Sequence, residues 1–257
     1  MLLAIDIGNS NIILGAFGGE RGTPPLFVAR ISTRAGSTAD ECAVTLSGVL
    51  SLYRFAPIAF DGALISSVVP GLDSAWLDAV SRVCGIPAVL LGPGVKTGLN
   101  IKIDNPAQLG ADLVAGAVAA SELFPLPAAV IDLGTATKIS ALDENGAFLG
   151  CVISAGVELS LRALASGTAQ LPLVHLKAPA RVIGTNTANS MKAGLITGTA
   201  AMLDGLVGRM EEELGLKMTA IATGGLAKPV ISSCKREIIH CENLVLEGLR
   251  IIYYRNR

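Results

Sequence analysis

The sequence has few aromatic residues, few charges and no long apolar run. Aromatic side chains make up 4% and charged side chains 16% of its 257 residues, and the formal net charge is −1. Nucleic-acid-binding proteins usually carry a basic excess or patch, and this chain has no basic run. Because 51% of the residues are hydrophobic, an intrinsically disordered chain is also excluded.

The mean hydropathy of +0.58 raises the question of a membrane protein. The longest stretch without Asp, Glu, Lys or Arg has only 14 residues, 163–176, and it contains polar residues and a proline. A spanning helix needs about 20 mostly apolar residues. The first ten residues have no basic region and include Asp6, which excludes a signal peptide. We therefore expect a cytoplasmic protein that engages neither a membrane nor nucleic acid.

The five cysteines form no CxxC pair, and the two histidines form no HExxH motif. This pattern indicates neither a zinc site nor a disulfide framework. We expect buried free thiols in a reducing compartment.

A strand, a polar turn and a second strand occur twice along the chain. The segments LLAIDIGNSN and AAVIDLGTAT each contain an apolar run, Asp-x-Gly and small polar residues, and their aspartates lie 126 residues apart. Such a duplication predicts two similar α/β domains that face each other across a cleft. We place them at residues 1–115 and 116–257, with the last helix as a candidate for packing back on the first domain.

The rest of the chain alternates between helical and strand patterns. Helical spacing of apolar residues predicts helices at 39–53, 75–84, 110–123 and 187–214, and apolar runs predict strands at 62–69, 88–91 and 218–222. Four glycines fall inside the last of these helices, where each costs about 1 kcal/mol relative to alanine. We expect these glycines to mark either close packing of the backbone or the approach of a ligand, and we favour packing.

The repeated turn is a candidate phosphate site, because the chain has neither a GxxxxGK[ST] nor a GxGxxG motif. Gly8 and Gly134 allow backbone N–H groups to approach phosphate oxygens, and Asp6 and Asp132 can hold a cation. The side-chain donors beside the two glycines are Asn9, Ser10, Asn11, Thr135 and Thr137. The alternative is a structural turn in which Asp and Asn cap their own backbone, but two copies favour phosphate binding.

Two further motifs each have a structural and a functional interpretation. Asp112 starts the predicted helix after Gly110 and is either an acid favoured by the helix dipole or a general base for a hydroxyl group. The turn of Thr223, Gly224 and Gly225 is either a generic strand–helix connection or a nucleotide contact. In the second case, the glycines would leave no side chain in the path of the nucleotide.

These motifs together resemble the type III pantothenate kinases, members of the acetate-kinase, sugar-kinase and actin-like ATPase superfamily. The matching segments are DIGNSN at 6–11, STADE at 37–41, SSVVP at 66–70, GAD at 110–112, DLGTAT at 132–137, LASGTAQLP at 164–172, IGTNT at 183–187, TGG at 223–225 and LVLEGLRIIYYRN at 244–256. The resemblance implies two duplicated RNase H-like domains facing a nucleotide cleft. It also implies a homodimer that builds the substrate site at the subunit interface.

The family transfers the γ-phosphoryl group of ATP to the primary hydroxyl of pantothenate, the first step towards coenzyme A. By resemblance, Asp112 is the catalytic base, Asp132 binds a monovalent cation (K⁺ or NH₄⁺), and Asp6 is a candidate for Mg²⁺. The implied ATP and phosphate contacts are Asp6, Ile7, Gly8, Asn9, Ser10, Asn11, Ile12, Ile13 and Thr135, to which we add Gly224 and Gly225. The implied substrate contacts are Ile103, Gly110, Ala111, Asp112, Leu113 and Thr187.

Several positions depart from the family pattern. Leu113 replaces an arginine, Ile103 replaces a tyrosine, and Lys138 and Ser140 replace a threonine and an aspartate. Lys138 is either an exposed strand lysine or an ammonium that replaces the monovalent cation beside Asp132. The departures leave open two alternatives to a pantothenate kinase. These are a catalytically impaired paralogue with an ATP-binding or regulatory role, and a kinase with a different small hydroxyl substrate.

Overall fold

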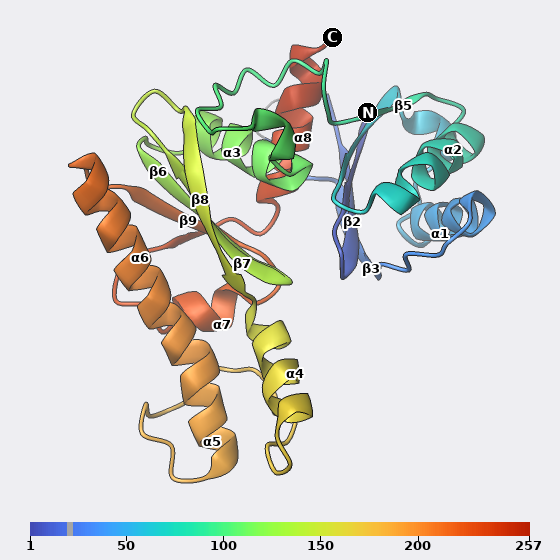
Figure 1. Ribbon diagram of the computed structural model, residues 1–257. Helices are drawn as coiled ribbons and strands as arrows, with labels where there is room; N and C mark the ends of the chain where they lie inside the picture. Colours follow the sequence, from blue (N-terminus) through green and yellow to red (C-terminus); the bar gives the residue numbers. More distant parts are fainter. Residues whose placement is uncertain (20–22) are drawn as a thin grey trace. The chain divides into compact units, whose positions relative to one another are not determined.

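The computed structural model describes residues 1–19 and 23–257 (Figure 1). The chain forms two compact units, each built around a five-stranded mixed sheet with helices, so the predicted α/β class is confirmed. Unit 1 consists of Met1–Gly98, Asn105–Ala119 and Leu244–Arg257, and unit 2 of Leu99–Asp104 and Ala120–Asn243.

The sheet of unit 1 has the strand order β3-β2-β1-β4-β5. Its central strand β1 pairs antiparallel with β2 and parallel with β4, so the predicted hairpin at the N-terminus is confirmed. The strands are β1 (Leu2–Ile7), β2 (Asn11–Phe17), β3 (Phe27–Ser32), β4 (Gly62–Ser67) and β5 (Ala88–Leu90).

Helices α1 (Ala39–Leu52) and α2 (Asp73–Cys84) cover one face of this sheet. Helix α1 begins at a capping box, in which Thr38 and Glu41 each satisfy a backbone N–H of the other. Helix α2 ends at Gly85, whose φ of 68° favours glycine. The two helices bury Leu46 and Trp76, among others, against the apolar side chains of β1 and β2.

Helix α8 (Leu244–Arg255) packs on the opposite face of the same sheet. Gly15 makes room for it, because a Cβ there would lie 2.8 Å from Leu246 Cδ1. Helix α3 (Ala111–Leu123) lies against α8, where a Cβ on Gly248 would collide with the carbonyl of Ala115. Glycine thus allows the C-terminal helix to fit closely within unit 1.

The sheet of unit 2 repeats this topology with the order β8-β7-β6-β9-β10. Central β6 pairs antiparallel with β7 and parallel with β9, as β1 pairs with β2 and β4. Helices α4 (Val157–Gly167) and α7 (Ala227–Ile231) contribute to its core. The strands are β6 (Ala128–Leu133), β7 (Ala136–Leu142), β8 (Phe148–Ala155), β9 (Thr219–Thr223) and β10 (Ile239–His240).

The predicted helix at 187–214 has the expected extent but is not α-helical throughout. It runs through α5 (Thr187–Lys192), a π-helical turn (Ala193–Thr197) and α6 (Gly198–Leu214). The expectation that its glycines mark close packing is wrong. In the described part of the chain, a Cβ on Gly194, Gly205 or Gly208 would meet no atom within 4 Å beyond its chain neighbours and the nearby backbone of its own helix.

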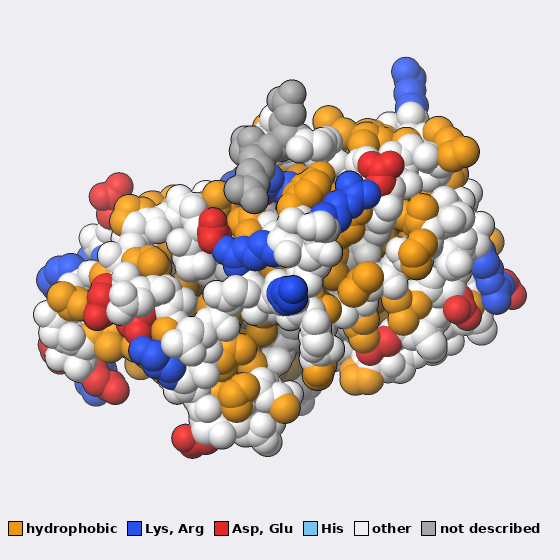
Figure 2. Space-filling view, turned by 90° about the horizontal axis from the view of Figure 1, so that it is seen from above, with side chains coloured by type: hydrophobic (Ala, Val, Ile, Leu, Met, Phe, Trp, Pro, Cys, Tyr) orange, Lys and Arg blue, Asp and Glu red, His pale blue; other side chains and the backbone are white. Residues whose placement is uncertain are grey.

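The surface agrees with the sparse charge of the sequence. On the face shown in Figure 2, acidic and basic side chains are interspersed among more numerous hydrophobic and uncharged groups. In the part of the chain that the structure describes, no helix is long and apolar enough to cross a membrane. Of the five thiols, Cys42 and Cys84 are buried as expected, whereas Cys151 is exposed.

Candidate functional site

The two Asp-x-Gly turns are candidate phosphate sites, and we refer to them as the phosphate turns. The first connects β1 and β2 in unit 1, and Thr33, which no motif of the sequence marked, holds it in place. The Gly8 N–H donates to the Asn11 carbonyl at 3.0 Å, which closes the turn. Thr33 follows β3; its hydroxyl donates to the Gly8 carbonyl at 2.6 Å and its N–H to the Ser10 carbonyl at 3.0 Å. Asn9 and Ser10 are exposed at the tip, so their polar groups remain accessible.

Asp6 lies at the carboxyl end of β1, opposite Ile13 of β2 and beside Ser66 of β4. It is half-buried, whereas Ile7 and Ile12 are almost completely buried in the core. Only the backbone groups of these two isoleucines are therefore suited to a phosphate contact. The Ser66 hydroxyl is buried and has no hydrogen-bond partner among the described residues.

The second phosphate turn, at Gly134 and Thr135 in unit 2, is enclosed by glycine backbone. The Gly156 N–H donates to the Thr135 carbonyl at 3.2 Å, and a Cβ on Gly156 would lie 2.5 Å from the Gly134 oxygen. Gly224, with a φ of 100°, approaches from β9, and a Cβ there would lie 2.6 Å from the Leu133 carbonyl oxygen. The structure thus places the predicted position Gly224 against Leu133, directly before the turn, and Gly156, which no motif of the sequence marked, against Thr135.

Asp132 and Lys138 face each other across the β6–β7 hairpin. The two are register partners, and the Lys138 Nζ lies 3.0 Å from Asp132 Oδ2. The Lys138 side chain is only 17% exposed, so the interpretation as an exposed strand lysine is wrong. The prediction that the Thr137 hydroxyl donates to phosphate is also wrong. Its side chain is only 1% exposed, and its hydroxyl has no partner among the described residues.

Asp112 occupies the first turn of α3, and its carboxylate folds back over the helix start. Its Oδ1 accepts the N–H of Leu113 at 2.8 Å, as expected for an acid at a helix N-terminus. A Cβ on Gly110 would lie 2.6 Å from the same oxygen, so glycine is needed for this side-chain position. Asp112 and Leu113 are both half-buried, which leaves the carboxylate partly accessible.

Ala111 begins α3 in unit 1, whereas the predicted substrate contacts Ile103 and Thr187 belong to unit 2. Ile103 lies in the segment Leu99–Asp104, which joins the edge of the second sheet through a bridge between Ile101 and Phe148. The neighbouring Lys102 pairs with Asp143 at 2.8 Å. Burial raises the pKa of Asp143, but hydrogen bonds from Lys102 and two backbone N–H groups outweigh this and lower it. Thr187 begins α5 and is exposed.

A ready-made metal site is not apparent in the described ranges 1–19 and 23–257, where no group of three or more His, Cys, Asp and Glu side chains is placed to hold an ion. Each phosphate turn offers one aspartate, Asp6 or Asp132. This donor set fits Mg²⁺, which is usually bound by one or two carboxylates together with substrate phosphates and waters.

Sequence comparisons agree along the whole chain. The sequence profile of the type III pantothenate kinases matches residues 2–209. A type III pantothenate kinase from Myxococcus xanthus is 41% identical over 256 residues, covering 100% of this chain and 99% of the relative. One from Streptomyces griseus is 42% identical over 264 residues, with 100% and 98% covered.

Solved structures share the fold at much lower identity. The inorganic polyphosphate/ATP-glucomannokinase of Arthrobacter sp. strain KM has a TM-score of 0.50 at 15% identity, with 99% of this chain and 98% of that chain covered. The ADPNP-bound activator of the 2-hydroxyisocaproyl-CoA dehydratase from Clostridium difficile has a TM-score of 0.52 at 12% identity, with 98% and 94% covered. These similarities concern the fold alone. The profile match and the full-length relatives establish that the chain belongs to the type III pantothenate kinase family.

Proposed function

We propose that this chain transfers the γ-phosphoryl group of ATP to the primary hydroxyl of pantothenate, giving 4′-phosphopantothenate in the first step of coenzyme A biosynthesis. The observation that carries the proposal is the identity of 41% and 42% with type III pantothenate kinases over the full chain. The two equivalent Asp-x-Gly turns support it, because phosphoryl transfer relies mainly on positioning and charge neutralisation.

The two turns divide the phosphate contacts in this proposal. In unit 1, the turn held by Thr33 presents N–H groups and the polar tip of Asn9 and Ser10, with Asp6 as the carboxylate for Mg²⁺. In unit 2, Thr135 and the backbone groups of Gly224 and Gly225 contact the nucleotide. Bound Mg²⁺ would offset phosphate charge.

Asp112 is the proposed general base. A carboxylate within reach of the acceptor hydroxyl takes its proton during attack on the phosphorus. The hydrogen bond from the Leu113 N–H fixes the carboxylate at the start of α3. Ile103 and Leu113 carry no charge, so the pantothenate carboxylate needs other partners, and Thr187 is the proposed hydroxyl contact.

Lys138 is the proposed replacement for the monovalent cation. Its ammonium lies 3.0 Å from the Asp132 carboxylate, within the distance of a direct ion pair. A permanent positive charge beside the second turn favours the phosphate group. This arrangement leaves no need for K⁺ or NH₄⁺ at Asp132.

The substitution Asp112→Asn tests the function and the base together. We expect turnover of ATP with pantothenate to fall about 10²- to 10⁴-fold, while calorimetric ATP binding stays unchanged. Asp78→Asn, an exposed aspartate on α2 of the same unit, is the matched control and should keep full activity.

Full activity of the Asp112→Asn variant would remove Asp112 from the mechanism. A wild-type protein that binds ATP but shows no effect of pantothenate on turnover or binding would favour the impaired paralogue. Turnover with another small alcohol alone would favour a kinase with a different acceptor.

A homodimer is the proposed assembly, with an interface next to Thr187. Three large apolar side chains before α5 are strongly exposed: Leu173 at 70%, Val182 at 68% and Ile183 at 82%. Such exposure is typical of surfaces that a partner covers. We expect a dimer in analytical ultracentrifugation and a shift towards monomer in Ile183→Asp; a monomeric wild type would contradict the proposal.

A further inference from the structure

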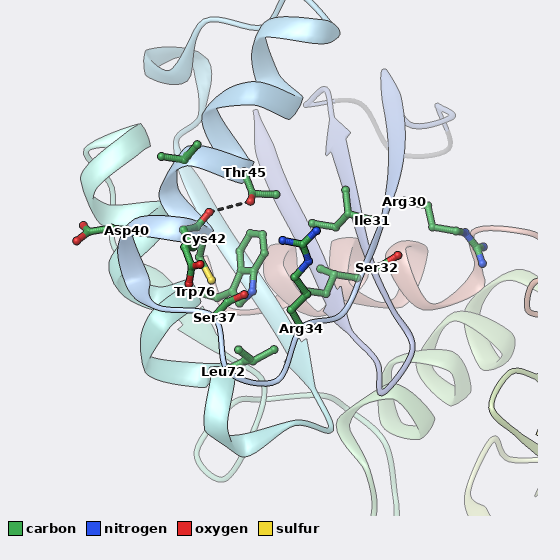
Figure 3. A pocket seen from close by; sticks show the side chains of 13 residues that line it. Arg30, Ile31, Ser32, Arg34, Ser37, Asp40, Cys42, Thr45, Leu72 and Trp76 are labelled. Carbon is green, nitrogen blue, oxygen red and sulfur yellow. Dashed lines mark hydrogen bonds between the residues drawn. The ribbon is translucent and has the colours of Figure 1, made fainter.

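A cavity of about 740 Å³ lies within unit 1, beside the edge strand β3 and the start of α1 (Figure 3). Its lining includes Ile31, Arg34, Ser37, Leu72 and Trp76, and we call it the β3–α1 cavity. Among the residues assigned above to ATP or pantothenate, only Ile12 reaches it. Its size lies within the range of about 300–1,000 Å³ that is usual for small-molecule sites.

Trp76 provides an unused hydrogen-bond donor at the wall of this cavity. The residue is 2% exposed, and its indole Nε1–H has no hydrogen-bond partner among the described residues. Buried polar groups are nearly always hydrogen-bonded, so an exception calls for an explanation. An acceptor atom of a bound molecule would satisfy the indole N–H.

Arg34 provides a charged donor on the same cavity. Its guanidinium extends towards the cavity in Figure 3, and Arg30 of β3 is a second arginine of the lining. Arg34 forms no ion pair with a carboxylate of the described chain within 4.0 Å. A guanidinium in this position is suited to a carboxylate or phosphate group.

Two acidic residues, Asp40 and Glu41, also line the cavity, and each has a partner of its own. Glu41 Oε2 accepts the N–H of Thr38 at 2.8 Å and its hydroxyl at 3.1 Å, and these bonds, together with the nearby charge of Arg34, lower the pKa of Glu41. Asp40 pairs with Arg82 at 2.5 Å. The donors that the lining offers to a ligand are the guanidinium groups of Arg34 and Arg30, the Trp76 indole and the hydroxyl groups of Ser32 and Ser37, while Ile31 and Leu72 form apolar walls.

We propose that the β3–α1 cavity binds a small organic anion whose acidic group engages Arg34 and Trp76 and whose apolar part packs against Ile31 and Leu72. Asp112, the proposed general base of the kinase reaction, is not among the residues that line this cavity. Its chemistry calls for acceptor oxygens at one end of the ligand and a hydrocarbon portion at the other.

Trp76 makes the proposal directly measurable, because it is the single tryptophan of the chain. We would titrate the full-length protein with pentanoate and with uncharged pentanamide, following tryptophan fluorescence and the indole N–H resonance. We expect a saturable change in both signals with pentanoate and a much weaker response to pentanamide. Arg34→Gln should weaken pentanoate binding about 10- to 150-fold, the range for loss of a hydrogen bond to a charged group.

Arg54→Gln is the matched control, because Arg54 is also exposed in unit 1 but does not line the cavity. It should bind pentanoate like the wild type. The proposal is overturned if pentanoate moves neither signal, or if Arg34→Gln responds as strongly as the wild type. The second result would assign any response to binding elsewhere, such as the acceptor site.

Discussion

The two hairpins that carry the phosphate turns are nearly superimposable in pattern and differ in one decisive position. In both, an aspartate stands second from the end of the central strand, and β1 and β6 bury the same positions, as do β2 and β7. In unit 1, Asp6 lies opposite Ile13, seven residues later, whereas in unit 2 Asp132 lies opposite Lys138, six residues later. The second turn is one residue shorter.

The difference of one residue in turn length decides which side chain lies opposite the aspartate. Counted from the aspartate, Lys138 corresponds to Ile12, which is buried in the core of unit 1. Because side chains alternate between the two faces of a strand, a shift of one residue turns every side chain to the opposite face. With the shorter turn, the Lys138 ammonium lies against Asp132. With the strand register of unit 1, the Lys138 side chain would instead point into the core.

The hairpins also differ in how the rest of each unit holds the turn. Thr33 fixes the first turn by hydrogen bonds, while Gly156 and Gly224 fix the second by backbone contact. A hydrogen-bonded turn can move by a few tenths of an ångström more easily than one enclosed by backbone. The comparison predicts a tolerant first turn and an intolerant second turn.

Matched alanine substitutions test this difference and should give the largest effect on stability. Gly156 has an ordinary backbone conformation, so Gly156→Ala acts through its collision with the carbonyls of Gly134 and Thr135. We expect a loss of about 3 kcal/mol in the free energy of unfolding. Gly8→Ala places its Cβ 3.0 Å from the Asn11 oxygen and should cost about 1 kcal/mol or less. Equal losses in urea unfolding would break the comparison.

Acid should weaken unit 2 before unit 1, as the next largest effect. Hydrogen bonds from Arg236 hold the pKa of Glu211, a buried residue of α6, at about 2 instead of its ordinary 4.5. The folded state thus binds this proton less readily than the unfolded state. The stabilisation is complete above pH 4.5 and is lost as the pH falls towards 2, in total roughly 3 kcal/mol.

The two units can be followed separately in this experiment, because the single tryptophan, Trp76, lies in unit 1. We expect circular dichroism to report acid-induced loss of structure before the Trp76 fluorescence changes. Glu211→Gln should flatten the dependence between pH 4.5 and 2. Coincident transitions by both probes would contradict the assignment to unit 2.

Lys138→Ile makes the second hairpin resemble the first and should have the smallest effect. It leaves Asp132 without the ammonium, so we expect kinase activity in sodium buffer to fall about tenfold and to recover with added K⁺, consistent with loss of a charged hydrogen bond. Lys138→Arg keeps the positive charge and serves as the control. A wild-type enzyme that already depends on K⁺ would rule out the replacement of the cation by Lys138.

Local patterns predicted much of the fold but not the contacts between distant segments. The hairpins, the helices α1, α2 and α3 and the extent of 187–214 follow from apolar periodicity and turn residues. The edge strands β3 and β8 were not assigned. The roles of Thr33 and Gly156 were missed for a related reason, since each acts on a turn 20 or more residues away in the chain.

The candidate site shows the same division between local and distant information. The sequence by itself determined the duplicated Asp-x-Gly turns, the position of Asp112 at a helix start and the family, because these depend on neighbouring residues and their order. Only the tertiary structure decided that Lys138 meets Asp132, that Gly224 lies against the second turn and that Trp76 and Arg34 share a cavity. These contacts depend on strand register and on packing between segments far apart in the chain, which no local pattern contains.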